Sequence, residues 1–399
     1  MQQTPNYGLN KPEQTDLVNI DDLNTNFDII DTELKKTYTQ DSKDNTVTFT
    51  QAASDEELTS GSQLATLWGL TKKKLSVLYY RTRSLKIRLD CDSFGSVGTT
   101  GKLFCDRLAN EKSYILTNSS VGSQRLYDAW SKIKNEVPVP SPFDIHFLNL
   151  GFNDVRLWGG SSNLYIDMQI RLIRLLQYLR LQTIKSNTDV TVTYNGTWQV
   201  FSPVPESLTG TSKYTTEKNA SVSFSFFGNK VSIGTFKVAA PSNVGTIQIK
   251  IDNVVHDTLN LAQWEGRDGS GMYVIELSGL SDSQHTCTVT KTDNTTNQVF
   301  FDWWGIPSDN PPLIIVNGLT KMKTESYAES APYNKGNDTY MLAASNYLRM
   351  TCANYFKDKV IYVDQSDFDP NNYDLVAADG VHPNDFGHSW ISDNILKRL

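Results

Sequence analysis

The sequence predicts an α/β domain that is interrupted by an all-β insertion. Three stretches of different hydrophobic pattern indicate this. Nearly continuous apolar runs such as 144–150 alternate with helical patterns up to about residue 188, as expected for a parallel sheet covered on both faces. Short alternating runs separated by turn residues follow over 189–307, at the spacing of a β-sandwich. From Pro311 the buried-strand pattern returns.

The elements of the α/β part follow from periodicity. Strands are expected at 85–89, 114–117, 144–150, 311–316 and 360–363, and helices at 102–109, 164–181 and 340–356, before a terminal helix. The helix at 164–181 carries Arg171, Arg174 and Arg180, which we expect on a solvent-exposed face because charge runs on helices usually are. Together, 84–188 and 308–399 are expected to form one domain.

Residues 1–80 differ from the rest of the chain. They are polar and acidic, with helical patterns only at 21–36 and 63–78. A stretch of this composition cannot bury a core of its own size. We therefore expect an attachment segment that folds against a partner or in an oligomer.

Composition limits the classes of function. The chain has 399 residues with 37 Lys and Arg against 44 Asp and Glu, a net charge of −7, which argues against binding to nucleic acid or an anionic membrane. No apolar run reaches the roughly 18 residues of a membrane span, and the amino terminus lacks a signal-peptide pattern. The four cysteines form no CxxC pair, so we expect free, buried thiols, no metal site and no cofactor.

Five histidines are candidates for a general base at neutral pH. His146 falls in an expected buried strand, and His256 and His285 fall in the insertion, so we expect these three to be structural or exposed. The remaining two each follow an aspartate by three residues, in the pairs Asp379/His382 and Asp385/His388.

Spacing alone does not separate the two pairs. An aspartate at this spacing can accept a hydrogen bond from the imidazole and stabilise its protonated form. Gly380 and Pro383 demand a turn around His382, whereas His388 enters the expected terminal helix. We therefore favour Asp379 and His382.

The candidate nucleophile is Ser93, which follows the first expected strand and precedes a glycine-bearing loop. Side chains at the carboxyl ends of parallel strands meet at one sheet edge, where α/β active sites form. Asn153, in Gly151-Phe152-Asn153-Asp154, follows another strand, and Gly122 follows a third. The Ser93 and Gly122 backbone N–H groups and the Asn153 amide could together hold a tetrahedral oxyanion.

Ser93, Gly122, Asn153 and His382 occur in the order of the four blocks of the SGNH (GDSL-type) hydrolases, which the sequence resembles. Gly151–Asp154 and Asp379–Asn384 are similar to that family's third and fifth blocks, while the first block has Cys91 in place of the usual glycine. The resemblance implies a flavodoxin-like three-layer α/β/α fold. It also implies metal-independent esterase or deacetylase activity, with Ser93 as nucleophile, His382 as base and Asp379 orienting it.

One rival chemistry uses the same strand. Asp90-Cys91-Asp92 could be the Asp-x-Asp of a magnesium-dependent phosphohydrolase, with Asp90 as nucleophile. That hypothesis leaves Asn153 and the Asp379/His382 pair without roles, so we do not favour it.

The amino-terminal segment resembles the attachment segments of phage tail and receptor-binding proteins. Residues 4–12 and 24–31 resemble the attachment opening, and 60–73 resemble a helical connector that precedes a functional domain. The resemblance implies a virion-tail location, contacts with other tail or baseplate proteins, and a homotrimer.

The insertion is similar to the jelly-roll, carbohydrate-binding-like modules found inside some esterases of this family. Its candidates for stacking on sugar rings are Trp198, Trp264, Trp303 and Trp304. Adjacent residues of a strand point to opposite faces, so at most one of Trp303 and Trp304 is expected to face the core of the module.

The sequence therefore predicts a phage tail esterase that removes acetyl groups from a bacterial surface polysaccharide. The alternatives are a non-catalytic receptor-binding protein that retains the hydrolase scaffold and a bacterial cell-wall esterase. The amino-terminal segment disfavours the second of these.

Overall fold

The structure is a computed structural model that describes residues 2–3, 10–11, 30, 84–204, 207–237, 245–261, 271–329, 331–355 and 359–399. The chain divides into two compact units, Met1–Thr82 and Arg83–Leu399. In the first unit, β1 (Gln2–Gln3) pairs antiparallel with β2 (Asn10–Lys11). The tail-attachment motifs and the helices expected at 21–36 and 63–78 lie outside the described residues, apart from a few single positions.

The second unit contains a five-stranded sheet in which every neighbouring pair is parallel. Numbered along the chain, its strands have the order 2-1-3-4-5, which is the flavodoxin-like order. The mixed α/β architecture predicted from the sequence is confirmed. In sheet order the strands are β4 (Ile115–Asn118), β3 (Lys86–Cys91), β5 (Ile145–Asn149), β18 (Leu313–Asn317) and β19 (Val360–Val363).

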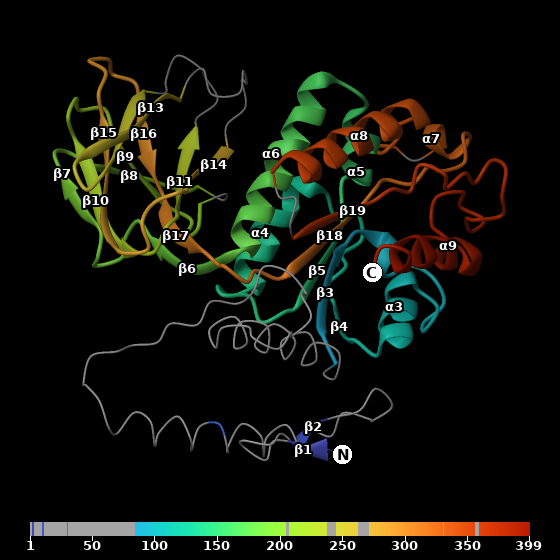
Figure 1. Cartoon of the computed structure of the whole chain (residues 1–399). Helices are drawn as coiled ribbons and strands as arrows, with labels where there is room; N and C mark the ends of the chain where they lie inside the picture. Colours follow the sequence, from blue (N-terminus) through green and yellow to red (C-terminus); the bar gives the residue numbers. More distant parts are fainter. Residues whose placement is uncertain are drawn as a thin grey trace. The chain divides into compact units, whose positions relative to one another are not determined.

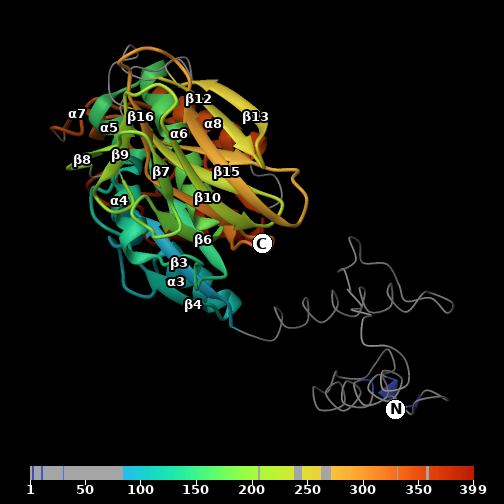
Figure 2. The same ribbon diagram turned by 90° about the vertical axis from the view of Figure 1, so that its left-hand side faces the viewer.

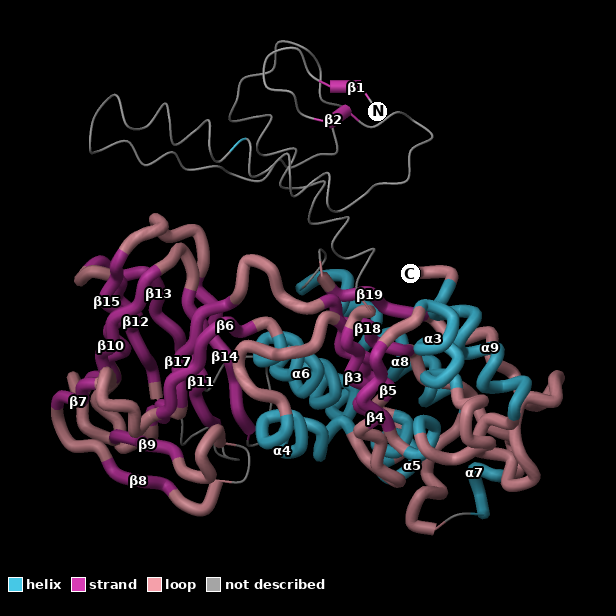
Figure 3. Tube along the Cα trace, turned by 90° about the horizontal axis from the view of Figure 1, so that it is seen from below, coloured by secondary structure: helices cyan, strands magenta, loops and turns pink. Residues whose placement is uncertain are grey.

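Helices lie on both sides of this sheet (Figures 1 and 3). On one side α3 packs against α9, and on the other α6 packs against both α4 and α8. β5 and β18 are buried between them, which explains their nearly continuous apolar sequences. β3 is buried as well, and its charged Arg88 and Asp90 pair with each other at 2.8 Å. The helices are α3 (Phe104–Lys112), α4 (Leu126–Glu136), α5 (Phe152–Trp158), α6 (Ser162–Leu179), α7 (Ser326–Glu329), α8 (Asp338–Tyr355) and α9 (Asp385–Leu396).

The prediction of a solvent-exposed arginine face on α6 was wrong. Arg171 and Arg174 are only 6% and 2% exposed. The Arg171 guanidinium lies 3.9 Å from the centre of the Tyr127 ring and pairs with Asp167 at 2.6 Å. Because α6 is enclosed by α4, α8 and the strand β14 (Gly271–Leu277), its arginine stems cover aromatic rings instead of reaching water.

The all-β part consists of antiparallel sheets that pack as a sandwich (Figure 2). One sheet has the order β13-β12-β15-β10-β7, the second β14-β11-β17-β6, and a three-stranded sheet has the order β16-β9-β8. Alternating side chains of the first two sheets form one apolar core, which explains the period-2 sequence pattern. The remaining bounds are β6 (Leu181–Ser186), β7 (Thr193–Asn195), β8 (Gln199–Phe201), β9 (Ser212–Thr215), β10 (Ser221–Phe227), β11 (Val231–Lys237), β12 (Thr246–Ile251), β13 (Val254–Asn260), β15 (Gln284–Lys291), β16 (Val299–Phe301) and β17 (Trp303–Pro307).

The sandwich begins earlier in the chain than position 189, where composition places the change. The strand β6 starts directly after α6 and pairs with β17, so both connections to the α/β part lie side by side. Trp303 of β17 belongs to the same apolar core as the sheet and helices of the α/β part. The two parts of the second unit therefore share buried contacts.

Candidate active site

Ser93 lies where the sequence places it, immediately beyond the carboxyl end of β3. It opens a short 3-10 helix (Ser93–Gly95), and the Asp92 side chain caps this turn by accepting a hydrogen bond from the Phe94 N–H at 3.0 Å. β3 and β5 are the first and third strands of this sheet in chain order, and they are neighbours at the point where the strand order reverses. Ligands of such sheets bind at this switch point.

The structure brings His382 and Asp379 to Ser93. His382 Nε2 lies 2.8 Å from Ser93 Oγ, and His382 Nδ1 lies 2.5 Å from Asp379 Oδ2. With its Nδ1–H donated to the carboxylate, the imidazole presents Nε2 as an acceptor for the serine hydroxyl proton. This is the geometry of a nucleophile, a base and an orienting carboxylate.

The loop before α9 holds this imidazole through its backbone. Asp379 Oδ1 accepts hydrogen bonds from the Val381 and His382 N–H groups, and Gly380 has a φ of +67° that favours glycine. Partial burial acts to raise the pKa of Asp379, but hydrogen bonds from His382 and Val381 outweigh it and lower the pKa. The carboxylate therefore stays ionised opposite the imidazole.

The other Asp-x-x-His pair, Asp385 and His388, makes structural contacts away from Ser93. His388 is buried in α9, where Nδ1 accepts a hydrogen bond from the Phe104 N–H at 3.3 Å and Nε2 lies 3.2 Å from the Val97 carbonyl oxygen. Burial lowers its pKa. Asp385 pairs with Lys102 at 2.6 Å. This histidine ties α9 to the start of α3.

Asp90, the nucleophile of the rival phosphohydrolase hypothesis, is enclosed. It is fully buried and receives two 2.8 Å hydrogen bonds from the Arg88 guanidinium, with Lys132 Nζ at 3.3 Å. A carboxylate neutralised in this way is a structural ion pair and a poor nucleophile.

The two outer oxyanion candidates occupy the same sheet edge but differ in availability. The Val121 N–H donates to the Cys91 carbonyl oxygen at 3.0 Å, so the loop that carries the exposed Gly122 runs beside the end of β3. Asn153 is buried, and its Nδ2 lies 3.2 Å from the Gln124 carbonyl oxygen and 3.4 Å from Asp92 Oδ2. An oxyanion contact from Asn153 requires its amide to exchange one of these partners for the substrate oxygen.

Cys91 fits its position because a neighbouring amide engages its sulfur. Asn149 Nδ2 lies 3.1 Å from Cys91 Sγ, and Asn149 Oδ1 accepts a 2.6 Å hydrogen bond from Asn317. Asn317 in turn accepts from Gln365 at 2.8 Å. This buried chain joins the ends of β3, β5 and β18 behind the candidate site, and burial raises the pKa of the thiol well above its usual range. All four cysteines are free and buried, as expected.

Two buried carboxyls shape the site and were not singled out from the sequence. Burial raises the pKa of Asp92 to about 7 and that of Asp154 to about 6. Asp154 accepts hydrogen bonds from the Leu126 N–H at 2.7 Å and the Tyr127 N–H at 3.3 Å. It thereby fixes the start of α4 directly after the Gly122 loop. Its place beside Asn153 in the sequence was the available signal.

Arg156 is a third residue that the sequence analysis missed. Its guanidinium lies 5.4 Å from the Phe152 ring centre and 5.6 Å from that of Tyr333, and Nη1 lies 3.5 Å from Asn153 Oδ1. Within the described part of the chain its buried Nε has no hydrogen-bond partner. Burial lowers the pKa of Arg156, while the nearby Asp92 acts to raise it.

Two of the tryptophans proposed to bind sugar are buried. Trp303 and Trp304 are 0% and 5% exposed. Trp198 is partly buried and packs edge-to-face on Tyr194 at 5.1 Å. Trp304 stacks on Phe224 at 4.7 Å in the sandwich core, and Trp303 packs toward the α/β part. They do point to opposite faces, but the second face is covered by the α/β part, so their assignment as glycan-binding residues was wrong. Trp264 lies outside the described residues.

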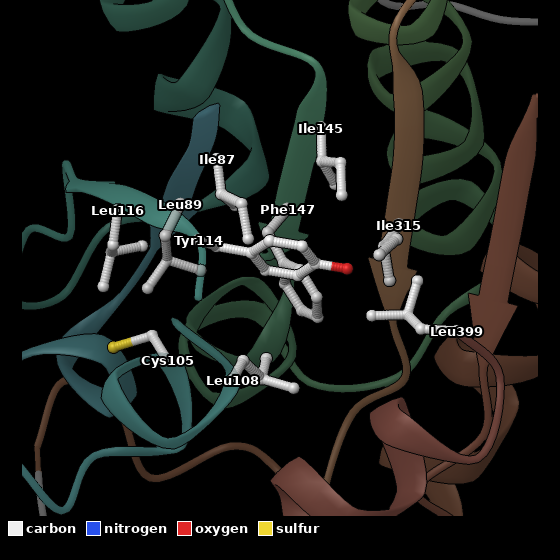
Figure 4. A pocket seen from close by; sticks show the side chains of 10 residues that line it. All are labelled: Ile87, Leu89, Cys105, Leu108, Tyr114, Leu116, Ile145, Phe147, Ile315 and Leu399. Carbon is white, nitrogen blue, oxygen red and sulfur yellow. The ribbon is translucent and has the colours of Figure 1, made fainter. Parts of the chain in front are cut away.

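A small apolar pocket lies between α3 and one face of the sheet (Figure 4). Its lining consists of Ile87, Leu89, Cys105, Leu108, Tyr114, Leu116, Ile145, Phe147, Ile315 and Leu399. Among the described residues, no three His, Cys, Asp or Glu side chains form a group that could hold a metal ion. In that same part of the chain, no helix has the length and apolar character needed to cross a membrane.

Comparisons with known proteins give carbohydrate esterases and carbohydrate-binding modules at low identity. A two-domain esterase (CEX) active on acetylated mannans is 10% identical, with a TM-score of 0.31 over 60% of this chain and 95% of that one. A family two carbohydrate esterase from Cellvibrio japonicus is 16% identical, with a TM-score of 0.24 over 45% and 51%. A family 35 carbohydrate binding module from Clostridium thermocellum is 12% identical, with a TM-score of 0.25 over 32% and 98%.

Sequence comparisons add little to this. The family model for type II transport protein GspH matches residues 170–254, which begin inside α6 and end at the first residue of β13. This stretch coincides with no single part of the fold. No curated relative matches the sequence.

Proposed function

We propose that this protein is an SGNH-type serine esterase that removes acetyl groups, or similar acyl groups, from a bacterial surface polysaccharide. The observation that supports this best is the 2.8 Å contact between Ser93 Oγ and His382 Nε2, with Asp379 at 2.5 Å from the other ring nitrogen. The parallel sheet of order 2-1-3-4-5 with helices on both faces is consistent with the three-layer hydrolase fold.

In the proposed reaction, Ser93 Oγ attacks the acyl carbonyl carbon while His382 Nε2 takes the hydroxyl proton. The negative charge that develops on the carbonyl oxygen is held by the Ser93 and Gly122 N–H groups and by the Asn153 amide. His382 then gives the proton to the sugar oxygen, which leaves as an alcohol. A water molecule, deprotonated by His382, attacks the acyl-enzyme and releases acetate and free Ser93. Asp379 stabilises the imidazolium in both steps.

The test compares hydrolysis of 4-nitrophenyl acetate by the full chain and by Ser93→Ala, with circular dichroism to show that both are folded. We expect turnover by the wild type and background rates for Ser93→Ala, whose missing hydroxyl removes the nucleophile. An equally active Ser93→Ala variant would overturn the assignment. If the wild type is also silent, the non-catalytic receptor-binding alternative is favoured, and binding to bacterial cells becomes the next measurement.

The biological setting is a separate proposal that is supported by sequence alone. We propose that residues 1–80 attach the enzyme to other tail or baseplate proteins of a virion, as a homotrimer. Sedimentation analysis of the full chain and of a chain beginning at Arg83 tests this. We expect a trimer that dissociates when the segment is removed, and a monomeric full chain would contradict it.

A further inference from the structure

Two large aromatic side chains lie exposed beside the candidate active site. Tyr127 is in the first turn of α4 and Trp158 is the last residue of α5. They are 42% and 41% exposed, and their ring centres lie 6.0 Å apart in an edge-to-face arrangement. Aromatic side chains bury most of their area in ordinary packing, so an exposed pair of this kind indicates a binding surface.

Two guanidiniums hold the pair in place. The Arg125 guanidinium lies 5.2 Å from the Tyr127 ring centre and 5.1 Å from that of Trp158. Two 2.6 Å hydrogen bonds to Asp128 fix this guanidinium, and Arg171 lies 3.9 Å from the Tyr127 ring centre. The cations stack on part of the ring surface, and about two fifths of each side chain stays exposed. The surface is preorganised before any ligand arrives.

Buried contacts link the pair to the residues beside the nucleophile. Phe94, next to Ser93, lies 4.8 Å from Phe152 between ring centres, and Phe152 is the first residue of α5. Six further residues lead to Trp158, a rise of about 9 Å along the helix. Asp154, on the same helix, accepts a hydrogen bond from the Tyr127 N–H. A polysaccharide whose acetyl group reaches Ser93 and whose chain continues along α5 would place a neighbouring ring on this surface.

We propose that Tyr127 and Trp158 form a subsite for a neutral pyranose ring of the polysaccharide whose acetyl group is removed. This inference rests on the proposed esterase function. The C–H face of a pyranose carries partial positive charge and matches the negative face of an aromatic ring. A neutral ring is inferred because both cations at the pair already have their charge matched, Arg125 by Asp128 and Arg171 by Asp167.

The buried tryptophans of the β-sandwich are not available to bind this sugar. Trp303 and Trp304 serve the packing of the module and its junction with the α/β part. Sugar recognition next to the acyl group is therefore assigned to α4 and α5 of the α/β part.

The test uses two acyl donors that differ in the sugar. The full chain, Trp158→Ala and Trp158→Phe are assayed on 4-nitrophenyl acetate, which has no sugar, and on a panel of mono-O-acetylated disaccharides of glucose, mannose, xylose and galactose. We expect Trp158→Ala to lose about fivefold to tenfold in kcat/KM on the preferred disaccharide, mainly through KM, with the aryl acetate rate within twofold of wild type. Trp158→Phe should recover part of the loss.

Tyr373→Ala is the matched control. Tyr373 is 56% exposed and pairs with Trp390, so its removal deletes an aromatic ring that is even more exposed than Trp158. It should change neither rate. The inference is overturned if Trp158→Ala lowers both rates alike or lowers neither, or if the wild type hydrolyses the aryl acetate and none of the disaccharides. A wild type that hydrolyses none of these esters rejects the proposed function itself.

Discussion

At the scale of single residues, the candidate site depends on which of two similar histidines faces the serine. Both follow an aspartate by three positions, yet only the loop histidine, His382, contacts Ser93. The glycine and proline around it indicated a turn, and a turn leaves the imidazole free to reach across the sheet edge. The other, His388, uses both ring nitrogens to join α9 to the start of α3.

Substitution of the orienting carboxylate should separate chemistry from folding. In Asp379→Asn, the amide can donate to His382 Nδ1 and thereby favour the wrong tautomer, so we expect kcat on 4-nitrophenyl acetate to fall on the order of 10³–10⁴-fold. The exposed Asp309, paired only with Lys230 at 2.8 Å among the described residues, supplies the control Asp309→Asn. An Asp379→Asn variant within tenfold of wild type would argue against the triad.

His388→Gln is expected to show the reverse pattern. Loss of the imidazole leaves the Phe104 N–H without its buried acceptor, so the free energy of unfolding should fall by about 1–3 kcal/mol. The rate per folded molecule should stay near that of wild type. Urea unfolding and active-site titration measure the two quantities, and a lost rate with unchanged stability would assign catalysis to this histidine.

Asp92 should make stability depend on pH. Burial raises its pKa to about 7, above the usual value of 3.8. The folded chain therefore binds this proton more tightly than the unfolded chain, and ionisation costs stability as pH rises from about 4 toward 7. We expect Asp92→Asn to gain on wild type over this window when both are unfolded in urea at several pH values. A difference that is constant with pH would contradict the raised pKa.

At the scale of elements, α4 and α5 place the oxyanion candidates through one carboxylate. Asp154 of α5 receives the Leu126 and Tyr127 N–H groups at the start of α4, directly after the Gly122 loop. We expect Asp154→Ala to release both amides. This loss should lower the free energy of unfolding by about 1–3 kcal/mol. It should also reduce kcat while changing KM little.

Hydrogen exchange measures the release of these amides directly. The Leu126 and Tyr127 N–H groups should lose protection in Asp154→Ala, while amides in the distant strand β15 keep theirs. Retained protection at Leu126 would show that the helix start is held by other contacts.

The elements also show what the sequence could and could not reveal. The positions of strands and helices could be predicted from apolar periodicity, because an element buried on one face or on both faces has apolar residues at the matching spacing. The burial of Arg171 and Trp303 could not be predicted from periodicity. The helix face and the strand face that carry them are covered by segments that lie far away in the sequence. Likewise, Asn153 could be placed at the sheet edge, but its engagement by Asp92 and Gln124 depends on tertiary contacts.

At the scale of the whole molecule, the second unit should unfold as one. Trp303 of β17 lies in the core of the α/β part, and Trp304 beside it lies in the core of the sandwich. We expect Trp303→Ala to cost about 3–5 kcal/mol and to split the unfolding of residues 83–399 into two transitions. Circular dichroism, tryptophan fluorescence and residual esterase activity followed against urea should coincide for wild type. Transitions that are already separate in wild type would contradict the shared core.

The sandwich and the α/β elements on either side of it separate Ser93 from His382 by 289 positions. During translation at about 5–20 residues per second, roughly 15–60 s pass between synthesis of the serine and synthesis of its base. Throughout that interval the nascent chain carries an ordinary, unactivated hydroxyl. On the proposed mechanism, a chain that ends anywhere in the sandwich lacks the base and has no esterase activity, so hydrolysis reports that translation has continued past His382.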